Sequence, residues 1–336
     1  MERSQVCALV VSTQPSSGSK IPAGALHPLA RIAGKPVVSW IVDAALAASV
    51  RRVGVVAHDV EPADRDDLLD RADNAFVEVV TPRTDLTESL LDVLDRLGPE
   101  LALSDTAQIL LLPAEAPHID PVEIRRIIKL HRTSGNAATL LATAVGTDTD
   151  TVIERNDAGE ITSIHDVVVG GLTVLILRAS LLIPAMRRAS MDQWEAGVPV
   201  REIAGLLEQL GHRVEVVEPT DSLESISSLS SRSPVETRLY DRVASEWLER
   251  GVAMPDRRQV LIDGTVELGQ GVQILPGSVL QGSTVVADGA IIGPNTQLIN
   301  ATIGAGAEVP HSVVDGAEVE PHTGVTPFSV LSAESC

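Results

Sequence analysis

The sequence is poor in aromatic residues and in lysine. Phe, Trp and Tyr make up 2% of its 336 residues, so any core must consist of Leu, Val, Ile and Ala. Lysine occurs only at Lys20, Lys35 and Lys129, so a phosphate site would depend on these, on arginine or on backbone amides. The net charge of -20 argues against nucleic acid or an anionic membrane surface as a partner.

Cysteine and long apolar runs are also scarce. The two cysteines, Cys7 and Cys336, lie at opposite ends of the chain, so no disulfide framework is indicated. We therefore expect a reducing, cytoplasmic compartment. The first residues carry no recognisable signal peptide. No apolar stretch is long enough to span a bilayer, so membrane insertion is not expected.

A six-residue repeat dominates the last part of the sequence. No α-helix has this period, whereas short strands joined by tight turns and stacked as a solenoid fit it better than an ordinary β-sandwich does. The repeat consists of two columns of residues. The first column is aliphatic, and the second, four residues after each member of the first, is made of small or β-branched residues. The first column is Ile262, Leu268, Ile274, Leu280, Val286, Ile292 and Leu298, and the second is Val266, Val272, Ser278, Thr284, Ala290, Thr296 and Thr302.

The period is interrupted after Leu298. It passes through Ile303 and Val309, and we expect it to resume at Val313. From there the aliphatic column would continue through Val319, Val325 and Leu331, with Ala317, Thr323 and Ser329 as small partners.

The residues before the repeat alternate between strand and helix patterns. We predict strands over 6–12, 53–58, 76–80, 108–112, 138–145, 172–177 and 214–217, and a hairpin over 151–155 and 160–165. Helices are predicted over 36–49, 63–73, 86–97, 120–133, 200–210 and 234–250. Such alternation is typical of an α/β three-layer domain with a mostly parallel sheet. We expect this domain over 1–232, a linking helix and linker over 233–259, the solenoid over 260–331 and a tail over 332–336.

This order of parts resembles one family, the bifunctional N-acetylglucosamine-1-phosphate uridylyltransferase/glucosamine-1-phosphate acetyltransferases. The resemblance is most specific at residues 31–38, 109–120 and 239–262. It implies a Rossmann-like nucleotidyltransferase (pyrophosphorylase) domain followed by a short left-handed parallel β-helix of hexapeptide repeats.

The resemblance also implies a nucleotide loop, and the sequence of that loop differs here from the family's pattern. The family's loop is rich in glycine and carries an arginine and a lysine, which approach and neutralise phosphates. The matching vestigial positions here are Gln14, Ser16, Gly18, Lys20 and His27.

Further positions implied by the resemblance differ as well. The family's Mg²⁺-binding aspartate and asparagine fall on Glu115, one methylene longer, and on Ser227, a poor Mg²⁺ ligand. The uracil and sugar stretches fall near 84–88 and 148–151, which lack the family's glycines. An acetyltransferase arginine falls on Thr326.

We therefore interpret the chain as a degenerate, C-terminally truncated relative, with no catalytic residues, metal or cofactor expected. It would act as a scaffold or regulator linked to UDP-N-acetylglucosamine and cell-wall precursor metabolism. Its partners would be copies of itself in a homotrimer, an active paralogue in a hetero-oligomer, or another protein. One alternative is a divergent Mg²⁺-dependent nucleotidyltransferase that converts UTP and a sugar 1-phosphate to a UDP-sugar and pyrophosphate. A second is a sensor that binds a sugar nucleotide without turning it over.

Four histidines invite a metal-site interpretation: His27, His118, His131 and His165. They fall on different predicted elements and lack the close spacing of metal ligands, so we interpret them as surface or loop residues.

Overall fold

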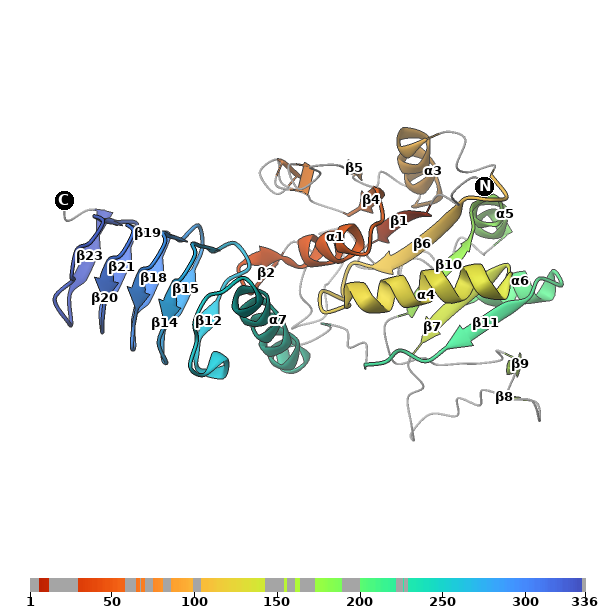
Figure 1. Ribbon diagram of the computed structural model, residues 1–336. Helices are drawn as coiled ribbons and strands as arrows, with labels where there is room; N and C mark the ends of the chain where they lie inside the picture. Colours follow the sequence, from red (N-terminus) through yellow and green to blue (C-terminus); the bar gives the residue numbers. More distant parts are fainter. Residues whose placement is uncertain are drawn as a thin grey trace. The chain divides into compact units, whose positions relative to one another are not determined.

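The computed structural model describes residues 6–11, 30–57, 65–66, 68–69, 75–80, 86–98, 104–142, 154–155, 161–163, 173–188, 200–221, 226 and 229–333. The chain divides into two compact units (Figure 1). The first contains residues 1–30 and 36–232, and the second contains residues 31–35 and 233–336. Within the described part of the chain, no helix combines the length and apolar character needed to cross a membrane.

A seven-stranded sheet organises the first unit, in the order β11-β7-β10-β6-β1-β4-β5. Its strands are β1 (Val6–Val11), β4 (Arg52–Val56), β5 (Phe76–Val80), β6 (Gln108–Pro113), β7 (Ala138–Ala142), β10 (Thr173–Arg178) and β11 (Val214–Val217). Neighbouring strands run parallel, except that β10 is antiparallel to both β6 and β7. The predicted mostly parallel sheet is confirmed.

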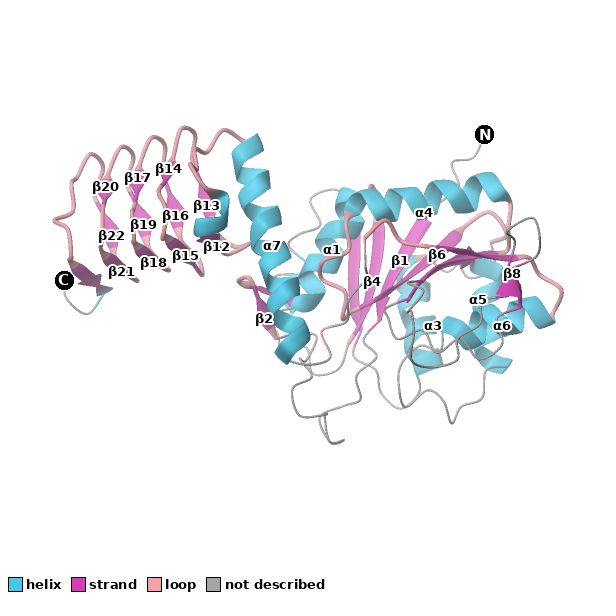
Figure 2. Ribbon diagram, turned by 90° about the horizontal axis from the view of Figure 1, so that it is seen from below, coloured by secondary structure: helices cyan, strands magenta, loops and turns pink. Residues whose placement is uncertain are grey.

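Helices cover both faces of this sheet (Figure 2). They are α1 (Val37–Ala47) and α4 (Pro121–Ser134) on one face, and α3 (Leu86–Leu97), α5 (Ala179–Arg188) and α6 (Val200–Gln209) on the other. Alternate residues of β1 enter the two resulting cores: Val10 packs with Ile41 of α1, and Leu9 packs with Leu94 of α3. Both faces are therefore buried, which explains the continuous apolar strands of the sequence.

Helix α4 begins and ends within one residue of its predicted bounds. Asp120 caps its N-terminus, since the side chain accepts a hydrogen bond from the Val122 amide at 2.6 Å, and Pro121 occupies the first turn. Gly135 ends the helix in the left-handed conformation, at φ 66°.

Several elements differ from the prediction. Helix α5, which contains Pro184, and the short paired strands β2 (Arg31–Ile32) and β3 (Lys35–Pro36) were not predicted. The predicted hairpin is present as antiparallel β8 (Glu154–Arg155) and β9 (Ile161–Ser163), and its turn lies outside the described residues. Of the predicted helix 63–73, four residues are described, and they are helical.

The long helix before the repeat, α7, starts earlier than predicted. It spans Leu229–Glu249, so Pro234 lies inside it and not at its start. Proline has no amide to donate, so the backbone ladder of α7 lacks one hydrogen bond at Pro234.

The second unit is the predicted left-handed parallel β-helix. The first three coils each contribute one strand to each of three parallel sheets, and the later coils contribute only β21, β22 and β23; the sheets are ordered β12-β15-β18-β21-β23, β13-β16-β19-β22 and β14-β17-β20. The strands are β12 (Leu261–Ile262), β13 (Glu267–Leu268), β14 (Gln273–Ile274), β15 (Val279–Gln281), β16 (Val285–Val286), β17 (Ile291–Ile292), β18 (Gln297–Ile299), β19 (Thr302–Ile303), β20 (Glu308–Val309), β21 (Val313–Asp315), β22 (Glu318–Val319) and β23 (Val330–Ser332).

The predicted aliphatic column is buried from Ile262 to Leu298, but the register after it was wrong at two positions. Ala301 is buried in place of Thr302, which is exposed, and Val314 is buried in place of Val313. The coil after Leu298 is two residues shorter than the one before, so Leu298 stacks on Val314.

The last coil is more open than the rest. Val325 and Leu331 are only half-buried there, and their expected partner Thr323 is exposed. No described coil follows to cover these side chains.

Candidate functional site

The parallel strands β1, β4 and β6 end at one edge of the sheet, where ligands bind in folds of this type. The five nucleotide-loop positions follow β1 in the sequence. These positions are Gln14, Ser16, Gly18, Lys20 and His27, and all of them lie outside the described residues.

Glu115 follows β6 directly at this edge. The backbone stays in register with β1, because the Ala114 amide donates to the carbonyl of Val11 at 2.9 Å. Glu115 is 4% exposed, and both flanking alanines are fully buried. A carboxylate is thus held in a closed environment at the position where the resemblance places a Mg²⁺ ligand.

The segment that carries the second implied ligand reaches the same place. Ser227 itself lies outside the described residues, but its neighbour Ile226 is buried. The Ile226 amide donates a long hydrogen bond, 3.5 Å, to the carbonyl of Glu115. The fold therefore brings together two segments that are more than a hundred residues apart in the sequence.

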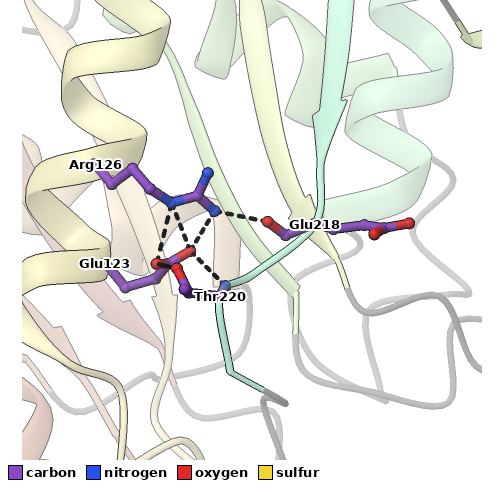
Figure 3. Close-up of polar contacts among 4 residues, drawn as sticks. All are labelled: Glu123, Arg126, Glu218 and Thr220. Atoms are coloured by element: carbon purple, nitrogen blue, oxygen red, sulfur yellow. Dashed lines mark hydrogen bonds and ion pairs between the residues drawn. The ribbon is translucent and has the colours of Figure 1, made fainter. Parts of the chain in front are cut away.

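A polar cluster lies where the chain leaves β11 (Figure 3). The carboxylate of Glu123 accepts hydrogen bonds from Nε and Nη2 of Arg126, one turn later on α4, and from the amide and hydroxyl of Thr220. Arg126 Nη2 also donates to the carbonyl of Glu218 at 2.6 Å. We call Glu123, Arg126 and Thr220 the clamp.

Opposing effects act on the carboxyl of Glu123. Burial disfavours its charged form, but the hydrogen bonds from Arg126 and Thr220 outweigh burial and hold the pKa of Glu123 below its usual value. Glu123 is therefore ionised at neutral pH. The sequence analysis did not identify the clamp; its only sequence signal was the spacing of Glu123 and Arg126, which places them on one helix face.

Of the four histidines considered as metal ligands, the structure describes His118 and His131. His131 is buried, with Nδ1 3.0 Å from the hydroxyl of Thr139, so its interpretation as a surface residue was wrong. Burial and the nearby charges of Arg178 and Arg132 lower its pKa to about 4. His118 is half-buried, and His27 and His165 lie outside the described residues. The described residues contain no group of three His, Cys, Asp or Glu side chains that could hold a metal ion.

The structure also describes the surroundings of Cys7 and Thr326. Burial raises the pKa of the Cys7 thiol to about 12, which makes it a poor nucleophile. Thr326 lies exposed in the last coil of the β-helix, and its carbonyl accepts hydrogen bonds from the hydroxyls of Ser329 (2.6 Å) and Ser312 (3.3 Å). The position of the implied arginine is thus occupied by a turn residue of the coil.

Comparisons with known proteins bear on this arrangement. The model of the family described as "MobA-like NTP transferase domain" matches residues 24–219. "Bifunctional protein GlmU" of Caldanaerobacter subterraneus subsp. tengcongensis is 25% identical over 319 residues, which cover 91% of this chain and 67% of that protein. The protein of the same name from Streptomyces avermitilis is 28% identical over 240 residues, which cover 66% of this chain and 49% of that protein.

Among solved structures, 4-diphosphocytidyl-2C-methyl-D-erythritol synthase from Anaerococcus prevotii is similar at a TM-score of 0.46 and 16% identity, covering 70% of this chain and 98% of that one. The two relatives confirm the resemblance expected from the sequence. Their alignments cover 67% and 49% of their own lengths, so a substantial part of each has no counterpart in this chain.

Proposed function

The chain belongs to the MobA-like NTP transferase domain family, and we propose that it is a member that has lost nucleotidyl transfer and acts as a scaffold or regulator. The process it would serve is the supply of UDP-N-acetylglucosamine for the cell wall, which the similarity to bifunctional GlmU proteins supports. No resident metal or cofactor belongs to this proposal.

One observation carries the proposal: the frame of the site is kept while its chemistry is changed. The backbones of Glu115 and Ile226 meet at the edge of the sheet, yet the side chains at the two ligand positions are glutamate and serine. Mg²⁺ requires near-ideal octahedral geometry and usually keeps several of its waters, whereas Glu115 is 4% exposed. Transfer of a nucleotidyl group relies on positioning and charge neutralisation, so such changes remove most of the catalysis.

The experiment is a pyrophosphate-release assay with UTP, N-acetylglucosamine 1-phosphate and Mg²⁺, run beside an active bifunctional relative. We expect turnover at least about a thousandfold below that of the relative, since loss of even one stabilising group costs a hundred- to a thousandfold. Turnover comparable to that of the relative would refute the proposal.

A second candidate function is a divergent Mg²⁺-dependent nucleotidyltransferase. The retained carboxylate of Glu115, beside the segment that leads to Ser227, favours it. In that case Glu115 would hold Mg²⁺, and Lys20 and His27 would neutralise phosphate. Any activity should then disappear in Glu115→Ala and persist in Asp92→Asn, a change on the exposed surface of α3. Full activity of Glu115→Ala would count against this candidate.

We also propose that the β-helix assembles with copies of itself, as the resemblance implies, or with an active paralogue. Support comes from the outer face of the sheet β12-β15-β18-β21-β23. Leu261 is 42% and Val330 71% exposed there, whereas the sheet β13-β16-β19-β22 exposes Glu267 and Glu318 together with Val285, which is 39% exposed. An apolar outer face is what a packed interface requires.

Sedimentation of the purified chain tests the assembly. A trimer is expected, and the double variant Leu261→Asp/Val330→Asp should shift it toward the monomer, while Glu318→Gln should not. A chain that sediments as a monomer at all concentrations would contradict the homotrimer and leave the paralogue as the partner to test.

A further inference from the structure

Strand β11 is the outermost strand on one side of the first unit's sheet, and the chain after it returns toward the central strands. Strand β11 is parallel to β7, and β7 runs in the same direction as β6, so all three end at the same edge. The chain leaves β11 at Glu218 and reaches Glu115, behind β6, at Ile226. The segment from Glu218 to Ile226 thus begins at an edge strand and ends at the candidate site.

Pro219 prevents this segment from continuing the ladder of β11. A proline has no amide to donate, and the backbone groups beside it need other partners. The clamp supplies them from one turn of α4: Arg126 donates to the carbonyl before Pro219, and Glu123 accepts from the amide after it, at 2.6 Å and 3.4 Å. The hydroxyl of Thr220 adds a 2.5 Å hydrogen bond to Glu123.

The clamp is built for charge-assisted hydrogen bonding. Glu123 is 6% exposed, and each of its two carboxylate oxygens accepts a hydrogen bond from Nε of Arg126 at 3.1 Å. Figure 3 shows the carboxylate of Glu218 directed away from this cluster, so Arg126 is the charged group that faces Glu123 there. Hydrogen bonds to charged groups are shorter and stronger than neutral ones, and burial strengthens them further.

We infer that Glu123, Arg126 and Thr220 are positioning residues, which hold the start of the segment so that Ile226 is placed against Glu115. They act through the segment and touch no reacting group. The inference goes beyond the proposed function, because it concerns the geometry of the site and does not depend on nucleotidyl transfer. Failure of either one leaves the other standing.

Hydrogen exchange of the unliganded full-length chain, resolved at the amides of Thr220 and Ile226, tests the inference. Thr220→Val removes one hydroxyl with little change of shape, and Glu123→Gln removes the charge. Both should raise exchange at Ile226 at least about tenfold, because local opening then becomes easier. Thr220→Ser keeps the hydroxyl and should restore exchange to within about twofold of the unmodified chain.

Asp92→Asn is the matched control. It breaks an ion pair with Arg96 on α3, which is likewise formed within one helix but lies on the opposite face of the sheet from α4. Exchange at Ile226 should stay unchanged in this variant.

Two outcomes would overturn the inference. One is unchanged exchange at Ile226 in both Thr220→Val and Glu123→Gln. The other is an equal rise across the whole first unit, since the residues would then support the fold in general and not this segment.

Discussion

The hydroxyl of Tyr240 on α7 donates a hydrogen bond to Oδ1 of Asp263, 3.2 Å away in the first coil of the β-helix. The other oxygen of Asp263 accepts from the Gly282 amide in the second coil at 3.0 Å. Burial raises the pKa of Asp263, and these two hydrogen bonds oppose that rise. One buried carboxylate therefore joins the helix and two coils of the second unit.

Asp263→Ala should destabilise the second unit. It removes the acceptor of the hydrogen bonds from the Gly282 amide and the Tyr240 hydroxyl, and the loss of one intramolecular hydrogen bond costs about 0.5–1.5 kcal/mol. Asp263→Asn keeps one acceptor oxygen and should cost less than Asp263→Ala. Urea unfolding of the full chain measures both, and equal stability of the two variants would contradict the role of Asp263 as a shared acceptor.

The stability of the first unit should fall as the pH is lowered from about 6.5 to about 4, in part because of His131. The pKa of His131 is about 4 in the folded chain, compared with an ordinary value of 6.5, so the unfolded chain binds the proton first. One pKa unit corresponds to about 1.4 kcal/mol, so the loss reaches at most about 3.5 kcal/mol.

Urea unfolding should show this loss of stability when it is measured at about pH 7.0 and at about pH 4.5, near the two ends of the pH range. His131→Gln keeps a polar partner for Thr139 but has no titrating group, so its loss over this range should be smaller. An equal loss in the variant and the unmodified chain would rule out His131 as a source of the pH dependence.

Gly54 and Gly205 should respond in opposite directions to alanine. A Cβ at Gly54 in β4 would lie 2.2 Å from Cγ1 of Val93 and 2.9 Å from Cδ2 of Leu9, so Gly54→Ala should cost about 1–3 kcal/mol. A Cβ at Gly205 in α6 would meet nothing within 4 Å, so Gly205→Ala should stabilise by about 0.5–1 kcal/mol. Thermal unfolding distinguishes them, and a stabilising Gly54→Ala would contradict the close packing of α3 on β4.

The two isoleucines of β17 should differ in how much stability is lost when each is replaced by alanine. Ile292 is fully buried between the stacked residues Ile274 and Val309, so Ile292→Ala should cost about 2–5 kcal/mol. Ile291 points outward and is half-buried, so Ile291→Ala should cost about 1 kcal/mol or less. Similar losses would mean that the inward column does not carry the stability of the β-helix.

The sequence predicted those elements whose patterns are set locally. Strand β5, helix α3 and strand β11 have the predicted bounds, because apolar periodicity and turn residues mark them. The register beyond Leu298 depends on stacking between coils. Val313 and Val314 are the same residue type, so only the pairing of Leu298 with Val314 shows which one faces inward.

The candidate site, too, could be predicted from the sequence only in part. Glu115 and Ser227 were found through the resemblance, and the structure describes a contact of Glu115 with Ile226, the residue before Ser227. The clamp could not be predicted, because Glu123 and Thr220 are 97 residues apart and no local pattern joins them. Pro234 predicts a helix start, because proline is common at the first helical position, whereas α7 starts at Leu229.

The most direct test of the account is a calorimetric titration of the purified chain with UTP and with UDP-N-acetylglucosamine, each with and without Mg²⁺. Binding of UDP-N-acetylglucosamine that does not depend on Mg²⁺ would favour a sensor. For UTP, the proposed function predicts no Mg²⁺-dependent binding even at millimolar concentration, because it assigns no working phosphate or metal site to this chain. Micromolar, Mg²⁺-dependent binding of UTP would contradict it and show that the site retains a working metal–nucleotide centre.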